Sequence, residues 1–410
     1  MTQTITARRD LFARILDPAS RHDPYPLYAR MRETPVSLQE DGTYAVSGYP
    51  EIAALLHDPR ISSDERKSSR GIAAMSASGR FDNPPFIFRD PPDHDRLRRL
   101  VMRQFTPERI ASMHQRVVTL VGGLLDAHRG HGQIDIVDDF AYPLPVTVIC
   151  ELLGVPRGDE PRFHDLASAL ARSLDPPESM TEQEIQHAGH ARAELREYLS
   201  GLATERRAQP RDDLISGLAA SRDGTEGTEQ MSHQDLLSTL VLLLVAGHET
   251  TVNLIANGML TLLRHPDALE RLRREPDLIT PLVEEVVRFD PPVQFRTRTT
   301  LADLQAAGIT IPQGATVALL LASGSRDPRR FPNADQFIPD RTDNQHFGFG
   351  GGIHYCVGAP LARIEAPIAL GELARRLATP SLLEDPPPYR ENAALRGPRH
   401  LQVTFDRLAD

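Results

Sequence analysis

A glycine-rich segment with one cysteine, residues 349–358, constrains this chain more than any other part of it. Cys356 lies near the end of the segment, shortly before residues with a helical pattern. A helix N-terminus lowers the pKa of a cysteine, because free backbone N–H groups and the positive end of the helix dipole stabilise the thiolate. Gly350, Gly352 and Gly358 lack a Cβ, so the backbone can turn tightly and lie against a large flat ligand. We therefore interpret Cys356 as the thiolate ligand of a haem iron.

The order Phe-Gly-x-Gly-x-His-x-Cys-x-Gly in this segment, followed by Leu-Ala-Arg-x-Glu at residues 361–365, resembles the haem-binding loop of the cytochrome P-450 monooxygenases. With average residue usage, the six fixed loop positions are expected by chance in roughly one chain in a million of this length. The alternative is an inert buried cysteine in a glycine-rich turn, but it leaves the glycine spacing unexplained. The resemblance implies haem b as the cofactor, with Cys356 as axial ligand and Phe349, Gly350 and Gly358 in contact with it.

A long apolar segment, about residues 232–264, predicts a buried central helix. Ser232 and Asp235 resemble a capping box at its start, and Arg264 followed by Pro266 two residues later marks its end. About thirty helical residues extend about 45 Å, which is enough to cross a whole domain. Because the segment is apolar almost all round, we expect it to lie in the core, and the resemblance places it over the haem.

Polar residues interrupt this apolar helix at Ala-Gly-His-Glu-Thr-Thr, residues 246–251. Ala246 and Gly247 are small enough for a flat cofactor to lie against them, and Thr250 can donate to the carbonyl four residues earlier, which bends a helix. Taken alone, the pattern also fits a helix kink with a solvated Glu249. The resemblance to the oxygen-activating helix of the family implies that Thr250 and Glu249 are the catalytic alcohol and acid, and that His248 is an outward or structural residue.

Glu285 and Arg288 lie three residues apart on one predicted helix face, where they can pair. Such pairs are common on protein surfaces, so the pattern alone also fits a surface ion pair. The resemblance implies a buried structural network beneath the cysteine loop, with Arg341 as its third member. Removing one partner of such a network leaves an unpaired buried charge, which costs roughly 3–5 kcal/mol.

The two propionates of a haem need cationic or hydrogen-bonding partners, and three separated places offer them. Residues 90–99 resemble the propionate-binding helix of the family, in which His94 and Arg98 lie four residues apart and hence on one helix face, although a solvated basic face has the same pattern. The resemblance adds Arg298 and His354. Arg296 competes with Arg298, and the sequence does not decide between them.

The coarse pattern predicts a mainly α protein with small β-sheets (α+β), and no linker or low-complexity tract divides it. We expect one domain over residues 1–410, with the resemblance spanning about 23–403. Residues 43–46 read as the second strand of a hairpin, and residues 309–312 and 316–320 as a strand and its neighbour. Helices are expected over 160–173 and 182–207, which by the resemblance form a mobile lid.

Composition and the lengths of the apolar segments indicate the cellular compartment of the protein. The chain has only two cysteines, of which Cys150 reads as ordinary core, so no disulfide framework is expected and a reducing compartment is favoured. The first 33 residues lack the apolar core of a signal peptide, and the longest apolar run falls short of the roughly 20 residues that span a bilayer. The net charge of -10 argues against nucleic acid as a partner. We expect a cytoplasmic monomer that binds no membrane.

The resemblance implies a monooxygenase that activates dioxygen and inserts one oxygen atom into a substrate, by hydroxylation or epoxidation. A mostly apolar pocket favours a sizeable hydrophobic substrate, such as a macrolide or other polyketide, a steroid or a terpenoid. The pocket residues implied by the resemblance are Leu243, Ala246, Gly247, Val293, Gln294, Phe295, Ala394 and Leu395.

No reductase domain is expected within 410 residues, so electrons from NAD(P)H should arrive through a ferredoxin reductase and a ferredoxin. Arg96, Arg99 and Arg103 recur at helical spacing and could dock an acidic ferredoxin, although a plain solvated face fits as well. Two other classes stay open: a peroxide-driven peroxygenase, which in this family typically lacks an acid and alcohol pair like Glu249 and Thr250, and a non-catalytic haem-thiolate sensor.

Overall fold

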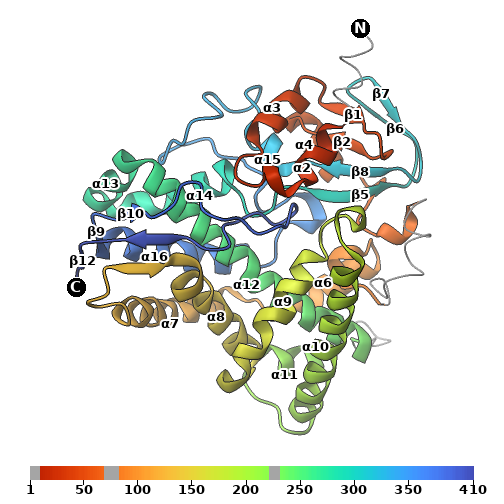
Figure 1. Ribbon diagram of the computed structural model, residues 1–410. Helices are drawn as coiled ribbons and strands as arrows, with labels where there is room; N and C mark the ends of the chain where they lie inside the picture. Colours follow the sequence, from red (N-terminus) through yellow and green to blue (C-terminus); the bar gives the residue numbers. More distant parts are fainter. Residues whose placement is uncertain (1–9, 69–82, 221–230) are drawn as a thin grey trace. The chain divides into compact units, whose positions relative to one another are not determined.

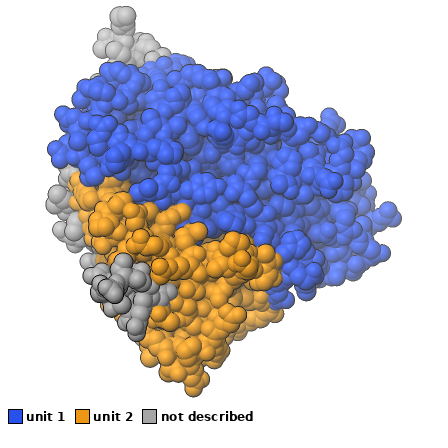
Figure 2. Space-filling view, turned by 180° about the vertical axis from the view of Figure 1, so that it is seen from behind, with its two compact units in different colours: residues 1–61, 114–144, 250–410 blue, residues 62–113, 145–249 orange. Residues whose placement is uncertain are grey.

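The computed structural model describes residues 10–68, 83–220 and 231–410, and these form many helices with a few small sheets (Figure 1). The prediction of a mainly α fold with small β-sheets is confirmed. The chain divides into two compact units, coloured separately in Figure 2. Unit 1 comprises residues 1–61, 114–144 and 250–410, and unit 2 comprises residues 62–113 and 145–249. The chain passes between the units four times, and the expectation of a single domain stays a prediction.

The largest sheet has the strand order β1-β2-β8-β5-β3. Its strands are β1 (Val36–Leu38), β2 (Tyr44–Val46), β8 (Thr316–Leu319), β5 (Arg296–Thr300) and β3 (Ile61–Ser62). β1 and β2 form the predicted antiparallel hairpin, β2 runs parallel to β8, and β8 runs antiparallel to β5. In the hairpin turn, the Asp41 carboxylate accepts a hydrogen bond from the Thr43 N–H at 2.9 Å, and Gly42 has a φ of 79°. The turn chemistry therefore explains why the sequence located this hairpin.

The predicted pairing of residues 309–312 with residues 316–320 is wrong. β7 (Ile309–Ile311) pairs with β6 (Leu304–Ala306) in a separate two-stranded sheet. Ala307 and Gly308 both have positive φ, 49° and 77°, which is the geometry of the tight two-residue turn that joins hairpin strands. This local turn closes β7 onto β6 and leaves β8 to pair with β2 and β5.

Two further small sheets lie in unit 1. One has the order β10-β11-β4, formed by β10 (Ser381–Leu382), β11 (Gln402–Thr404) and β4 (Gln133–Asp135). The other pairs β12 (Arg407–Leu408) with β9 (Leu377–Ala378). Both bring the C-terminal segment onto earlier parts of unit 1.

The helices of unit 1 pack on two apolar clusters that involve opposite faces of the largest sheet. Ala45 and Ala318 belong to one cluster, and Val46 and Val317 belong to the other, as expected from the alternation of side chains along a strand. α14 packs against α16, and both lie in the same part of Figure 1. Among the described residues, the α-helices that lie wholly in unit 1 are α2 (Leu11–Leu16), α3 (Tyr25–Arg32), α4 (Tyr49–Leu56), α13 (Pro266–Arg274), α14 (Ile279–Phe289), α15 (Leu321–Gly324) and α16 (Ala359–Arg376).

Unit 2 is built from helices. In the described part of the chain they include α6 (Asp93–Met102), α9 (Phe163–Arg172), α10 (Glu182–Ala208) and α11 (Leu214–Ala220), together with most of α8 (Pro143–Leu153) and the first half of α12 (His233–Arg264). α7 (Pro107–Asp126) begins in unit 2 and continues into unit 1. Cys150 is fully buried in α8, as expected for a core residue, and burial raises the pKa of its thiol.

The two helices expected on either side of a proline-rich loop are observed as α9 and α10. α10 begins at a complete capping box between Thr181 and Glu184. Arg172, the last residue of α9, donates to the Asp175 carboxylate at 2.5 Å, to the Ser179 carbonyl at 2.5 Å and to Glu184 at 2.7 Å. One guanidinium therefore ties together the end of α9, the loop and the start of α10.

α12 (His233–Arg264) matches the predicted central helix to within one residue at its start. Ser232 accepts a hydrogen bond from the Asp235 N–H at 3.0 Å, which is half of the expected capping box. By length and composition this helix could cross a membrane, but 72% of its most apolar 18-residue window is buried. Its burial is that of a core helix.

Candidate active site

The cysteine loop is held in a tight shape by its own backbone. The Cys356 N–H donates to the Phe349 carbonyl at 3.0 Å. Gly350 and Gly352 have φ values of 71° and 60°, in the left-handed region that favours glycine. A Cβ at residue 352 would lie 2.1 Å from the carbonyl oxygen of Leu56, so only glycine fits there. The thiol of Cys356 is exposed, and α16 begins three residues later, as the sequence predicted.

Arg363, on the second turn of α16, anchors this loop to α14. Its guanidinium lies 4.5 Å from the centre of the Phe349 ring, and its Nε donates to Glu284 Oε1 at 2.7 Å. His346 Nε2 lies 3.1 Å from the other oxygen of Glu284. Burial favours the protonated form of Glu284, but the hydrogen bonds from His346 and Arg363 outweigh it and lower its pKa to about 2. Sequence analysis missed this cluster, because none of its members is unusual alone.

The structure brings Glu285, Arg288 and Arg341 together in unit 1. The Glu285 carboxylate receives two hydrogen bonds from Arg288, at 2.7 and 2.8 Å, and two from Arg341 Nε, at 3.2 and 3.1 Å. The side chains of Glu285 and Arg288 have no exposed surface, and that of Arg341 is 7% exposed. Arg288 also donates to the carbonyls of Ser325 and Ala334. The cluster is therefore a buried network rather than a surface ion pair.

One side of α12 is accessible in the middle of an otherwise buried stretch. Ala246 is exposed, and Gly247 and Thr250 are half-buried, while His248 and Glu249 are buried. Thr250 lies four residues after Ala246 and hence close to it on the helix surface, whereas Glu249 is turned by about 100°. The α-helix is unbroken through these residues, and a hydrogen bond from Thr250 to the Ala246 carbonyl remains a prediction.

His248 has a structural position. Its Nδ1 donates to the Leu244 carbonyl at 2.9 Å, and its Nε2 lies 3.4 Å from Glu249 Oε1. The ring is 1% exposed, so the expectation of a structural residue agrees with its contacts, but an outward position is wrong.

The residues of unit 1 that were predicted to bind the haem propionates are half-buried, and they lie on strand β5 and in the cysteine loop. Arg296 and Arg298 are two residues apart on β5, so they share one face of the strand. Arg298 donates to the Thr297 carbonyl at 2.8 Å, and His354 lies on the short turn before Cys356. The shared strand face explains why sequence alone did not separate Arg296 from Arg298.

The cationic candidates in unit 2 lie on α6. His94 is 1% exposed, with its Nδ1 at 2.8 Å from Asp95 Oδ1, and Arg98 is half-buried one turn later. Of the proposed docking residues, Arg96 is directed to Asp235 at 3.4 Å and is mostly buried, with 17% of its side chain exposed. Arg99 and Arg103 are exposed.

The predicted pocket segments of unit 1 lie side by side. Val293 forms a β-bridge with Leu395, and the Gln294 N–H donates to the Ala394 carbonyl at 3.0 Å. The Gln294 side chain accepts from the Tyr28 hydroxyl at 3.1 Å and donates to the Pro291 carbonyl at 2.7 Å. Its amide is thus engaged within unit 1. The ring of Phe295, 1% exposed, likewise packs edge-on against Phe12 at 5.5 Å. In unit 2, Leu243 is buried on α12.

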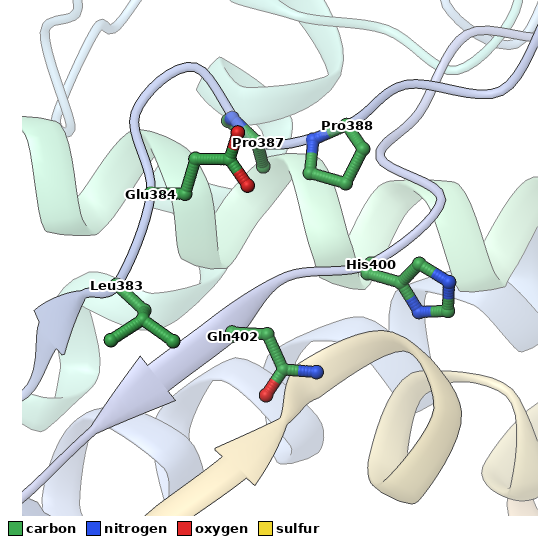
Figure 3. Close-up of a pocket in the computed structure, with 6 residues that line it drawn as sticks. All are labelled: Leu383, Glu384, Pro387, Pro388, His400 and Gln402. Atoms are coloured by element: carbon green, nitrogen blue, oxygen red, sulfur yellow. The ribbon is translucent and has the colours of Figure 1, made fainter.

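A surface pocket of about 300 Å³ lies elsewhere in unit 1 (Figure 3). His400, one of its lining residues, is held by the carboxylates of Asp135 and Asp138 at 2.9 and 3.1 Å from its Nδ1. The other lining residues are Leu383, Glu384, Pro387, Pro388 and Gln402. None of the candidate site residues lines this pocket.

The donor set fits a haem. In unit 1, a thiol is accessible at the end of a loop whose glycines present no Cβ, and cationic side chains suited to carboxylates come from β5 and the loop itself. An accessible strip of small residues on α12 provides a surface against which a planar group can lie. We therefore find the chemistry of these residues consistent with a thiolate-ligated haem.

Comparisons with known proteins find relatives that match nearly the whole chain. A model of the family described as Cytochrome P-450 matches residues 38–405. The chain is 40% identical over 397 residues to the cytochrome P-450 monooxygenase PikC of Streptomyces venezuelae, covering 94% of this chain and 92% of that protein. It is 38% identical over 419 residues to vitamin D(3) 25-hydroxylase of Pseudonocardia autotrophica, covering 99% and 98%.

Solved structures show the same fold. The ligand-free crystal structure of CYP164A2 from Mycobacterium smegmatis has a TM-score of 0.90 and 40% identity, covering 97% of this chain and 100% of that one. A structure of the same protein with econazole bound has a TM-score of 0.89.

Proposed function

Because the chain belongs to the cytochrome P-450 family and is a haem-thiolate monooxygenase, we propose that it inserts one oxygen atom into a hydrophobic small molecule with electrons from a separate ferredoxin system. The observation that carries the proposal is the exposed thiol of Cys356 in a loop that requires glycine, directly before α16. Bound haem supplies the reductive activation of dioxygen, and a thiolate ligand favours O–O cleavage.

Cys356 would hold the haem iron in this proposal, and the other haem contacts would come from the loop and from α12. Ala246 and Gly247 belong to the accessible side of α12, where small side chains allow a flat group to approach. The haem contacts in the cysteine loop are Phe349, Gly350 and Gly358, and the propionate partners are His94, Arg98, Arg298 and His354, with Arg296 as an alternative to Arg298.

Thr250 and Glu249 have different parts in proton delivery. Thr250 belongs to the accessible side of the helix, from which its hydroxyl could donate a proton. Glu249 is buried beside His248 and turned away from this side. We therefore assign the direct donor role to Thr250 Oγ1, and assign Glu249 to recharging that hydroxyl.

The substrate is proposed to be a macrolide or other polyketide, a steroid or a terpenoid. The lining expected for the pocket is mostly apolar, and the Gln294 amide, its main polar group, is occupied by Tyr28 and Pro291. Few polar anchors then remain, which favours a hydrophobic ligand. The similarity to vitamin D(3) 25-hydroxylase supports this class.

Electrons are proposed to pass from NAD(P)H through a ferredoxin reductase and a ferredoxin, in the cytoplasm. Arg99 and Arg103 remain as docking residues, since both are exposed on or next to α6. Arg96 is withdrawn from this patch, because Asp235 already binds it.

The test is turnover of hydrophobic candidates under two electron supplies. The holoenzyme is incubated with polyketide, steroid and terpenoid panels, either with ferredoxin, ferredoxin reductase and NAD(P)H or with hydrogen peroxide. Oxygenated product that depends on the ferredoxin system supports the proposal. Product with peroxide alone identifies a peroxygenase, and a haem protein that binds and turns over no member of the panels contradicts a catalytic role on this substrate class.

A further inference from the structure

Asn257 connects α12 to two distant segments of unit 1. Its side-chain Nδ2 donates to the carbonyl of Asp290 at 3.2 Å and to the carbonyl of Arg396 at 3.1 Å. The side chain is fully buried. Asn257 follows Thr250 by seven residues, about two helical turns, so both lie on nearly the same side of α12.

The two carbonyls belong to the segments that flank the predicted pocket walls. Asp290 precedes residues 293–295, and Arg396 directly follows residues 394–395. These walls are joined by the bridge between Val293 and Leu395 and by a hydrogen bond from the Arg396 N–H to the Pro292 carbonyl at 2.8 Å. One amide on α12 therefore binds both segments of the paired walls, which we call the wall ladder (residues 290–295 and 394–396).

Side chains make further contacts at the same point of the wall ladder. Arg396 donates to the Asp290 carboxylate, and its Nε donates to the Arg21 carbonyl at 2.6 Å. Tyr25 donates to the same carboxylate at 2.5 Å. Burial alone would lower the pKa of Arg396. The neighbouring groups, Asp290 foremost, together have the larger effect, so the pKa of Arg396 is raised. This buried pair therefore joins the two segments of the ladder at the point where Asn257 binds both of them.

A second contact lies one turn earlier on α12. A Cβ at Gly397 would lie 2.2 Å from Oδ1 of Asn253, which is 1% exposed. Asn253 precedes Asn257 by four residues, so the two asparagines face the same stretch of chain. The absence of a side chain at residue 397 lets the backbone approach the helix closely.

We infer that Asn257 is a positioning residue that fixes the distance between the Thr250 region of α12 and the wall ladder, and thereby determines which bulky ligands the pocket accepts. The inference rests on the proposed function, because the ladder is a pocket wall only in that proposal. An apolar side chain would fill the same buried space but could donate to neither carbonyl, whereas the neutral amide carries two N–H donors on one nitrogen.

The experiment compares a small and a large iron ligand in the haem-loaded Asn257→Leu variant. Imidazole is too small to reach the walls from the iron, whereas we expect the bulky aromatic groups of econazole, which was bound in a solved structure of CYP164A2, to reach them. Absorbance titration is expected to show the Kd of econazole raised about tenfold, as for two lost buried hydrogen bonds, with the Kd of imidazole unchanged. Equal changes for both ligands, or no change for either, would overturn the inference.

Two further variants keep the result interpretable. Thr261→Val removes a buried hydroxyl one turn further along α12, and in the described residues no hydrogen bond joins that side chain to Asp290 or Arg396, so both affinities should stay as in the wild type. In Gly397→Ala the new methyl group would press against Asn253, and we expect weaker binding of econazole with the Kd of imidazole unchanged. If Asn257→Leu does not fold, the Kd values of Gly397→Ala test the inference instead. A wild type that binds neither ligand contradicts the proposed function itself, whereas a wild type that binds both, without selective loss in the variants, contradicts only the role of Asn257.

Discussion

Arg288 forms a bidentate ion pair with Glu285, in which its Nε donates to Oε2 at 2.7 Å and a terminal nitrogen donates to Oε1 at 2.8 Å. Neither side chain has any exposed surface. Arg341 completes the contact from another segment at 3.1 and 3.2 Å. Paired charges without water are stable only while each keeps its partner. The geometry therefore makes Glu285 the residue on which α14 and the segment before the cysteine loop depend.

Glu285→Gln is expected to lower the free energy of unfolding by roughly 3–5 kcal/mol, because it leaves two arginines without a counter-charge in the core. Haem retention should fall with it, and urea unfolding together with the ratio of haem to protein absorbance measures both. Glu372→Gln is the matched control, since its partner Arg375 is 52% exposed and a surface pair contributes about 0–1 kcal/mol. Equal losses in the two variants would contradict the buried network.

The pH dependence of the Glu284 cluster has a defined sign. The pKa of Glu284 lies at about 2 in the fold, below its ordinary value of 4.5. The carboxylate therefore stabilises the fold above about pH 4.5, and this contribution is lost as the pH falls through 2. Glu284→Gln should be less stable than the wild type by on the order of 1–2 kcal/mol at neutral pH. Urea unfolding in increasingly acid buffers should show the difference shrinking, and a pH-independent difference would refute the assignment.

Thr250→Ala tests proton delivery. Without the hydroxyl, we expect electrons to be diverted into hydrogen peroxide and product formation to fall by on the order of 10²-fold. The measurement is peroxide and product formed per NAD(P)H consumed. Thr250→Ser keeps a hydroxyl and should restore most of the coupling. Fully coupled turnover in Thr250→Ala would remove this residue from the relay.

The exposed residues Arg99 and Arg103 give a prediction about reduction. Replacing both with glutamate should slow reduction by an acidic ferredoxin at low salt by about tenfold or more, and the difference should fade as salt screens the charges. Stopped-flow absorbance measures the rate. Reduction by dithionite should not change, and an unaltered ferredoxin rate would show that the partner docks elsewhere.

The features that the sequence predicted correctly are those marked by local signals, namely helix caps, prolines and glycines. The helix over residues 232–264 carries its own cap at Ser232 and its own stop at Pro266, so its bounds were predicted to within one residue. The cysteine loop has glycines at the positions that need positive φ or a close backbone approach. The pairing of β7 was wrong because the sequence analysis missed the tight turn at Ala307 and Gly308.

Contacts between segments far apart in the chain could not be predicted from the sequence. Arg363 reaches Glu284 across 79 positions, and Asn257 reaches Arg396 across 139. Each of these residues is ordinary by itself, and its role follows only from the packing of α12, α14 and α16. The contact of Gln294 with Tyr28, 266 positions earlier, likewise could not be foreseen.

The central claim is that Cys356 ligates a haem iron through its thiolate, and the visible spectrum of the dithionite-reduced protein with and without carbon monoxide tests it most directly. We expect a strongly red-shifted Soret band in the wild type and its loss in Cys356→His. A wild type without a haem band, or with a band typical of histidine ligation, would contradict the claim and leave Cys356 as a structural residue of the loop.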